Sequence, residues 1–179
     1  MGTGAGFPGI PLKIAFPGLK ITLLDSLNKR VGFLNEVIEA LGLTDITAVQ
    51  GRAEDYGRDP KYREQFDLCV SRAVANMSTL SEYCIPFVKK GGYFIPYKSG
   101  KADEEIEQAK SAVKKLGGEL KEVIVKVLPE TDVERTFVPV KKMTSIKNIP
   151  NVSRETFLPI NKNKAPVLCK SGSALVFYQ

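Results

Sequence analysis

The chain has 179 residues and is 43% hydrophobic, which is enough for one globular domain with a buried core. It has no histidine, and its three cysteines lie far apart, so a zinc site or a histidine-based triad lacks its parts. No run of eighteen apolar residues and no secretory signal pattern occurs, so we expect no membrane span and a cytoplasmic protein with reduced thiols.

The net charge of +6 is concentrated toward the C-terminal end. From Lys141 onward there are seven basic residues and a single acid, Glu155, whereas the two signs balance before Lys141. A basic tail on a neutral body indicates a polyanionic partner. A solvated, irregular end explains the same charge equally well.

Hydrophobic periodicity predicts alternating helices and strands along the chain. The expected helices are 8–16, 28–41, 77–88 and 103–116, and the expected strands are 20–24, 46–50, 66–70, 93–97, 120–127 and 135–140. Strands that alternate with long helices are typical of a parallel sheet covered on both faces. The last two strands have no helix between them, which predicts an antiparallel end. Beyond Lys142 the pattern is lost, although 174–178 could form an isolated strand.

A glycine-rich stretch, 2–9 (GTGAGFPG), precedes the first expected helix. Glycine adopts positive φ and lets a ligand approach bare backbone, and Pro8 suits the first turn of a helix. The stretch therefore predicts a loop whose free N–H groups face a cofactor. A tight turn without a ligand is the alternative.

Two acids follow the next strands, at the edge where open α/β sheets bind ligands. Asp25 ends one strand and can accept hydrogen bonds from a ribose diol, or it can cap the following helix. Glu54 follows the next strand and, with the backbone of Ala53, can meet an adenine edge, or it is a solvated loop acid. A dinucleotide fingerprint would need a third glycine where Phe7 stands, so the pattern favours S-adenosylmethionine.

Five stretches, in this order, resemble the bacterial 16S ribosomal RNA guanine-N7 methyltransferase family, also called glucose-inhibited division protein B: 2–9, 24–30 (LDSLNKR), 51–55 (GRAED), 71–75 (SRAVA) and 129–135 (PETDVER). The resemblance implies a class I S-adenosylmethionine-dependent methyltransferase fold, Rossmann-like and α/β. It also implies that S-adenosylmethionine is the cofactor and 16S ribosomal RNA, or the assembling small ribosomal subunit, the partner. By resemblance, the cofactor contacts Gly2, Phe7, Ala53, Glu54 and Arg72, with Gly4 and Asp25 as neighbours.

The implied chemistry agrees with a chain that lacks histidine. Guanine N7 has a lone pair and no proton, so methylation needs alignment rather than a general base. We expect Arg72 to be the catalytic residue, bound to the cofactor or to guanine O6, with a structural ion pair as the alternative. An enzyme that methylates an exocyclic amine would carry a characteristic motif after the strand 66–70, and this chain has none there. Methylation of carbon 5 needs a cysteine nucleophile, but Cys84 lies in the middle of an expected apolar helix, which favours a core residue. We expect no metal and a monomer.

Two departures from the family lead to further expectations. The family has helices and an apolar strand before the glycine loop, whereas Met1 directly precedes Gly2 here, so we expect an N-terminally truncated methyltransferase domain at 1–142 that lacks its first strand. Its neighbours in the sheet would then expose unpaired edges. The second departure is the basic segment 143–179, which we expect to be irregular. The alternatives to an active enzyme are an inactive fragment that at most binds RNA and a small-molecule methyltransferase.

Overall fold

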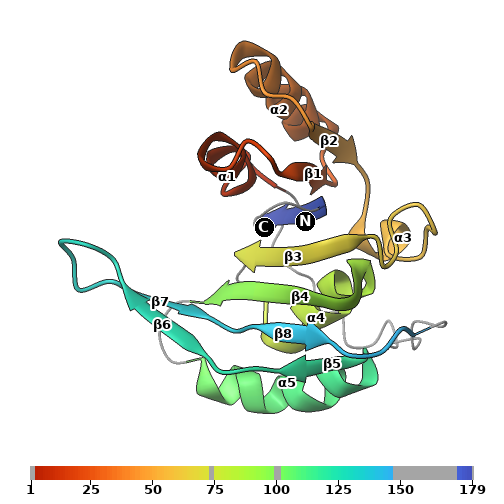
Figure 1. The fold of residues 1–179 in the computed structure, drawn as a ribbon, viewed down its shortest axis with the longest axis vertical. Helices are drawn as coiled ribbons and strands as arrows, with labels where there is room; N and C mark the ends of the chain where they lie inside the picture. Colours follow the sequence, from red (N-terminus) through yellow and green to blue (C-terminus); the bar gives the residue numbers. More distant parts are fainter. Residues whose placement is uncertain (1–2, 73–74, 99–101, 147–172, 179) are drawn as a thin grey trace.

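The computed structural model describes residues 3–72, 75–98, 102–146 and 173–178. In these ranges the elements are α1 (Gly9–Ala15), β1 (Lys20–Asp25), α2 (Asn28–Ala40), β2 (Ile46–Gln50), α3 (Ala53–Tyr56), β3 (Phe66–Arg72), α4 (Met77–Cys84), η1 (Ile85–Phe87), β4 (Val88–Lys98), α5 (Asp103–Lys115), β5 (Gly118–Leu120), β6 (Ile124–Val127), β7 (Glu134–Phe137), β8 (Val140–Lys142) and β9 (Ser173–Tyr178) (Figure 1). Among these residues, no helix is both long and apolar enough to cross a bilayer.

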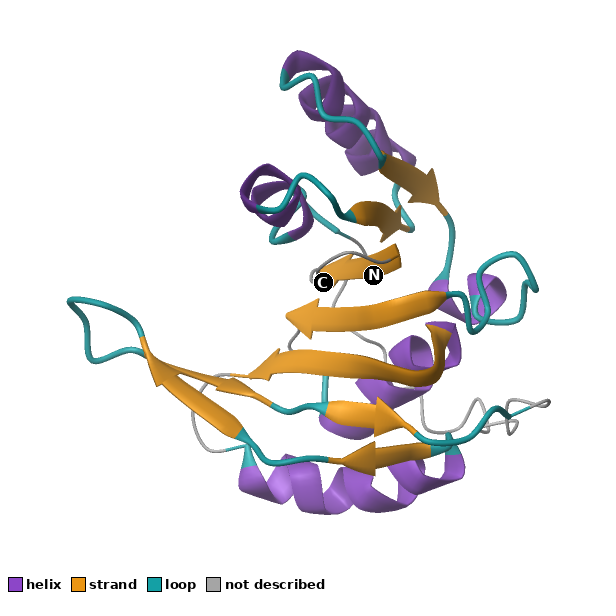
Figure 2. Ribbon diagram, viewed as in Figure 1, coloured by secondary structure: helices purple, strands orange, loops and turns teal. Residues whose placement is uncertain are grey.

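The strands form one sheet in the order β2-β1-β9-β3-β4-β7-β6, and β8 joins β4 to β5 (Figure 2). The first five strands of that order run parallel to one another. The pairs β4–β7, β4–β8, β5–β8 and β6–β7 are antiparallel. The prediction of a mostly parallel sheet with an antiparallel end is therefore confirmed.

Strand β9 corrects two expectations about the chain ends. It lies between β1 and β3 and pairs in parallel with both, drawn in blue in Figure 1. The inner edges of β1 and β3 are therefore paired, and the position of the expected missing strand is filled. Residues 173–178 are also not irregular, because two open edges provide backbone partners for an apolar segment. Residues 147–172 of the expected tail lie outside the described residues.

Prolines and short turns explain where the expected element bounds were wrong. The expected helix 77–88 ends at Cys84, and a 3-10 turn containing Pro86 leads into β4, which begins five residues before the expected strand. The segment 120–127 is divided between β5 and β6, and the segment 135–140 is divided at Pro139, which lacks an N–H for a ladder.

The hydrophobic core has two parts, one on each face of the sheet. Ile10 of α1 and Leu34 of α2 pack with alternate residues of β1 and β3 on one face. Helices α4 and α5 cover the other face with a larger cluster that includes Phe87 and Phe94. Because side chains alternate along a strand, adjacent residues such as Cys69 and Val70 belong to different clusters. This arrangement fixes the carboxyl ends of the parallel strands at one edge.

Candidate functional site

The glycine loop forms a tight turn beside the end of β1. Gly4 and Gly6 have positive φ (53° and 84°), which confirms the need for glycine there. Their N–H groups, however, bond within the protein: Gly4 donates to Asp25 Oδ2 (3.1 Å) and Gly6 to the Thr3 carbonyl (3.0 Å). A Cβ on Gly6 would lie 2.4 Å from Ile10 Cδ1, so this glycine permits close packing of the loop on α1. The prediction that these two amides are free for a cofactor is wrong, and Gly2 lies outside the described residues.

Asp25 holds the glycine loop through a side-chain hydrogen bond. Its side chain is fully buried, and Oδ1 accepts a hydrogen bond from the Leu27 N–H (2.8 Å) while Oδ2 accepts the bond from Gly4. The Arg30 guanidinium approaches Oδ2 at 3.6 Å. A carboxylate oxygen can accept two hydrogen bonds, so Oδ1, which accepts the Leu27 N–H, retains acceptor capacity.

The segment after β2 brings Ala53 and Glu54 to the same place. The Gly51 N–H donates to the Asp25 carbonyl (2.8 Å), which ties the end of β2 to the end of β1. A Cβ on Gly51 would lie 2.1 Å from the ring of Tyr56, so only glycine allows the ring to pack there. The chain then turns into α3, whose first residue, Ala53, is buried. Four of the predicted cofactor residues, Gly4, Asp25, Ala53 and Glu54, therefore come from connected segments of one edge.

Glu54 has one engaged and one unengaged oxygen. Oε1 accepts a hydrogen bond from Arg52 (3.1 Å), and this bond raises the pKa of Arg52. Oε2 is buried and has no hydrogen-bond partner. Burial, and after it the charge of Glu54, raises the pKa of the Tyr83 hydroxyl on α4, which places that phenol in the field of the carboxylate. A buried carboxylate oxygen without a partner is costly unless a ligand completes it.

Two further buried polar atoms lack partners, and both belong to the same edge. Within the described residues, the side-chain atoms of this kind are Glu54 Oε2, Thr3 Oγ1 and Ser71 Oγ. Thr3 stands in the glycine loop, and Ser71 is the penultimate residue of β3. Sequence reasoning missed Thr3 and Ser71. Both residues lie in stretches that resemble the methyltransferase family, 2–9 and 71–75, but threonine and serine are too common for that position alone to indicate a ligand contact.

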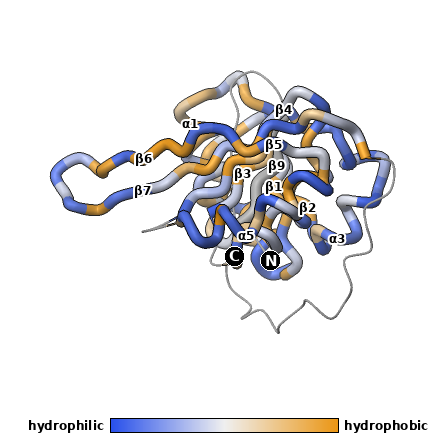
Figure 3. Tube along the Cα trace, turned by 90° about the horizontal axis from the view of Figure 1, so that it is seen from below, coloured by the Kyte–Doolittle hydropathy of each residue, from blue (hydrophilic) through white to orange (hydrophobic). Residues whose placement is uncertain are grey.

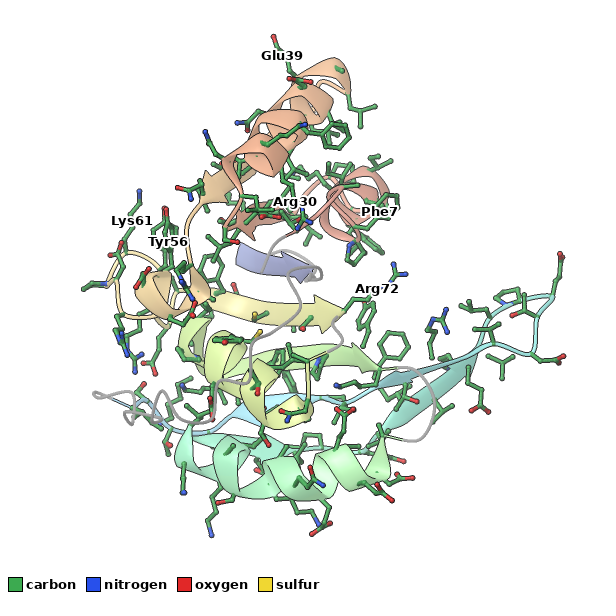
Figure 4. The ribbon with its side chains drawn as sticks, turned by 180° about the vertical axis from the view of Figure 1, so that it is seen from behind. Phe7, Arg30, Glu39, Tyr56, Lys61 and Arg72 are labelled. Carbon is green, nitrogen blue, oxygen red and sulfur yellow. The ribbon has the colours of Figure 1, made fainter. Side chains whose placement is uncertain are left out.

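Phe7 and Arg72 are the exposed predicted site residues at this edge. Phe7 is 50% exposed, and Arg72 is the exposed last residue of β3. Figure 4 shows the two on the same edge, on either side of the end of β9, with Arg30 near the glycine loop. The edge thus combines an exposed aromatic ring, an arginine and three buried side-chain oxygen atoms that have no hydrogen-bond partner.

The strand order, with a parallel part and an antiparallel end, is that of a class I S-adenosylmethionine-dependent methyltransferase fold. Solved structures share it: TYW2 of M. jannaschii in complex with AdoMet has a TM-score of 0.60 at 18% identity, over 80% of this chain and 67% of that one. An rRNA methylase from Streptococcus thermophilus has a TM-score of 0.55 at 14% identity, over 79% of this chain and 83% of that one.

The chain belongs to the family of rRNA small subunit methyltransferase G (GidB), whose family model matches residues 1–136. Ribosomal RNA small subunit methyltransferase G of Lachnoclostridium phytofermentans is 60% identical over 143 residues, which cover 80% of this chain and 59% of that protein. The protein of the same name from Lactobacillus acidophilus is 55% identical, over 80% of this chain and 60% of that one. The chain thus spans about three fifths of the length of these relatives.

Proposed function

We propose that this chain binds S-adenosylmethionine at the carboxyl edge of its sheet and transfers the methyl group to N7 of a guanine in 16S ribosomal RNA, free or in the assembling small subunit. The observation that carries the proposal is the set of three buried acceptors without partners, one each in the glycine loop, α3 and β3. Membership of the methyltransferase G family supports the same reaction. Such a protein would work in the cytoplasm, and we propose that it acts as a monomer without a metal.

The residues of this edge fit an adenosine-containing cofactor. Glu54 Oε2 would accept from the adenine amine beside the Ala53 backbone, and Asp25 would use its remaining acceptor capacity for the ribose diol. The exposed ring of Phe7 would supply an apolar wall. Gly4 has no side chain, so the cofactor would approach its backbone closely.

Arg72 would act on the guanine. Bound S-adenosylmethionine would supply a methyl group on a cationic sulfur. The lone pair of guanine N7 would take this methyl group as the carbon–sulfur bond breaks and its electron pair stays on sulfur, and no proton would be lost. The planar guanidinium of Arg72 can donate to guanine O6, next to N7, and so hold the attacking atom in line. Orientation of this kind accelerates a reaction that requires no general base.

The test is isothermal titration of this chain with S-adenosylhomocysteine, using variants of the buried acceptors. We expect micromolar binding, on the order of 8 kcal/mol. Thr3→Val and Ser71→Ala remove hydroxyl groups that have no partner, so they should leave thermal stability unchanged or raise it while weakening ligand binding. The matched control is Ser81→Ala, whose buried hydroxyl already donates to the Met77 carbonyl (2.8 Å) and should not affect the ligand.

Methyl transfer is tested separately with small-subunit ribosomal RNA and detected by mass spectrometry of the nucleosides. Binding of S-adenosylhomocysteine followed by 7-methylguanosine formation supports the proposal. Salt-sensitive RNA binding without any cofactor binding would instead identify an RNA-binding remnant of the enzyme. Methylation of a small molecule without RNA would replace the proposed substrate.

A further inference from the structure

A row of side chains crosses the sheet from Arg72 to its outer edge. The register pairs Arg72 with Tyr97 on β4, Tyr97 with Phe137 on β7, and Phe137 with Ile124 on β6. Residues directly opposite each other in neighbouring strands lie on the same face. These four side chains therefore form one continuous row that begins at the proposed point of methyl transfer.

This row lies on the face that α4 and α5 do not cover. Tyr97 packs against the cluster of α1 and α2, and those helices pack on β1 and β2 at the other end of the sheet. The opposite face at this position holds buried Thr136 and Lys98, which is paired with Glu105 of α5. Ile124 is 45% exposed, and Tyr97 and Phe137 are half-buried. Both aromatic rings thus keep part of their surface in solvent beside the site.

The two rings and the arginine act on one another. Tyr97 and Phe137 meet edge to face, with ring centroids 4.5 Å apart and an interplanar angle of 79°. Burial raises the pKa of Tyr97 to about 12, and the charge of Arg72 opposes this rise, so the phenol lies in the field of the guanidinium. The row is therefore a connected arrangement of a cation and two aromatic rings.

Two more cations extend the same face along the β6–β7 hairpin. Lys126 pairs with Arg135, two residues beyond Ile124 and Phe137, so both share the face of the row. Glu134 belongs to the other face, and Glu130 and Asp132 lie in the connecting turn. The hairpin reaches well beyond the body of the sheet, and Figure 3 shows its hydrophobic β6 beside the more hydrophilic β7. We call the side chains of Arg72, Tyr97, Phe137, Ile124, Lys126 and Arg135 the open face.

We propose that the open face holds the single-stranded nucleotides that flank the target guanine, with bases on Tyr97 and Phe137 and phosphates at Lys126 and Arg135. The inference rests on the proposed function, since it continues the path of the RNA outward from Arg72. Single-stranded RNA is held by aromatic platforms and cations together, which is the combination present. Binding of an apolar protein partner would not require that the cations Lys126 and Arg135 lie on the open face and the acid Glu134 on the opposite face.

The experiment measures fluorescence anisotropy of a labelled single-stranded RNA of about twelve nucleotides, a length within the usual site sizes. Phe137→Leu keeps an apolar side chain without a stacking ring and should weaken binding about tenfold. The double variant Lys126→Gln/Arg135→Gln should reduce the salt dependence of binding by roughly 0.7 in the logarithmic slope per cation removed. The matched control is Lys114→Gln/Lys115→Gln on exposed positions of α5, which should change neither quantity.

Binding of S-adenosylhomocysteine to the same variants separates this inference from the proposed function. We expect it to be unchanged, because none of the substituted residues belongs to the cofactor edge. If the cofactor product binds but the open-face variants retain wild-type RNA affinity, or weaken it no more than the α5 control does, the open face is not the RNA surface. If neither the wild type nor any variant binds the cofactor product while RNA binding still depends on the open face, the open face is an RNA surface and the proposed methyl transfer fails.

Discussion

Replacing Asp25 by asparagine tests whether this carboxylate holds the glycine loop in place. The side chain has no exposed surface and accepts hydrogen bonds from Leu27 (2.8 Å) and Gly4 (3.1 Å). Asparagine keeps one oxygen but turns an amide donor toward the other N–H, so one charge-assisted bond is lost and a buried donor faces a donor. The sum of these losses is about 3 kcal/mol. The ion pair with Arg30, at 3.6 Å and partly exposed, adds at most about 1 kcal/mol.

The assay is thermal and urea unfolding followed by circular dichroism. For a chain of this size, about 3 kcal/mol corresponds to a Tm lower by about 6–12 °C. The matched control is Asp59→Asn: Asp59 is exposed and its Oδ1 accepts the Lys61 N–H at 2.8 Å, so it makes the same local bond in water. We expect that control to stay within about 0.5 kcal/mol of the wild type.

The result that would refute this reasoning is equal stability of the two variants. Asp25 would then be a strand-end residue whose buried bonds are easily replaced, and the glycine loop would owe its position to the packing of Gly6 on Ile10 alone. Titration with S-adenosylhomocysteine well below the Tm adds a second readout. If Asp25→Asn folds there but does not bind, the carboxylate is required for ligand binding, either through the position of the glycine loop or through direct contact.

Three further predictions concern the sheet and its supports. Deleting residues 173–179 leaves β1 and β3 with open inner edges, and we expect loss of cooperative unfolding and aggregation on size-exclusion chromatography; a monomeric, cooperatively folding product would exclude β9 from the sheet. Gly51→Ala places a Cβ 2.1 Å from the Tyr56 ring and should lower the unfolding free energy by about 1–3 kcal/mol in urea titrations, whereas Gly18→Ala, with open space, should not. Burial raises the pKa of Glu64, but hydrogen bonds, one of them from Lys142, lower it overall from 4.5. The stability that Glu64 contributes is therefore present above pH 4.5 and is lost as the pH falls through the lower folded pKa. Glu64→Gln should make the free energy of unfolding depend less on pH in this acidic range.

The parallel part of the sheet was predictable because its signals are local. Asp25 ends an apolar run, and Gly42 follows a helix with apolar residues at helical spacing, so the bounds of β1 and α2 were close to those observed. Contacts across the fold were not predictable. Nothing in the order of residues says that the carboxylate of Asp25 is used by the Gly4 N–H, or that Ser71 is buried without a partner.

The antiparallel end shows where local reasoning was insufficient. Residues 120–127 alternate like one strand, but the chain leaves β8 after Leu120 and joins β7 from Ile124. This change of partner depends on Pro139, which interrupts the opposing strand. The open face, too, follows from the register between strands and not from spacing along any one of them.

The position of β9 follows from where the preceding described segment is held. The Ile146 N–H donates to Glu64 Oε1 (3.2 Å), just before β3, so the chain at residue 146 lies at the amino end of that strand. Ser173 pairs with Lys20 at the amino end of β1, next to the same place. A segment that enters at the amino end must run parallel to both neighbours, which is the direction that the gap between β1 and β3 requires.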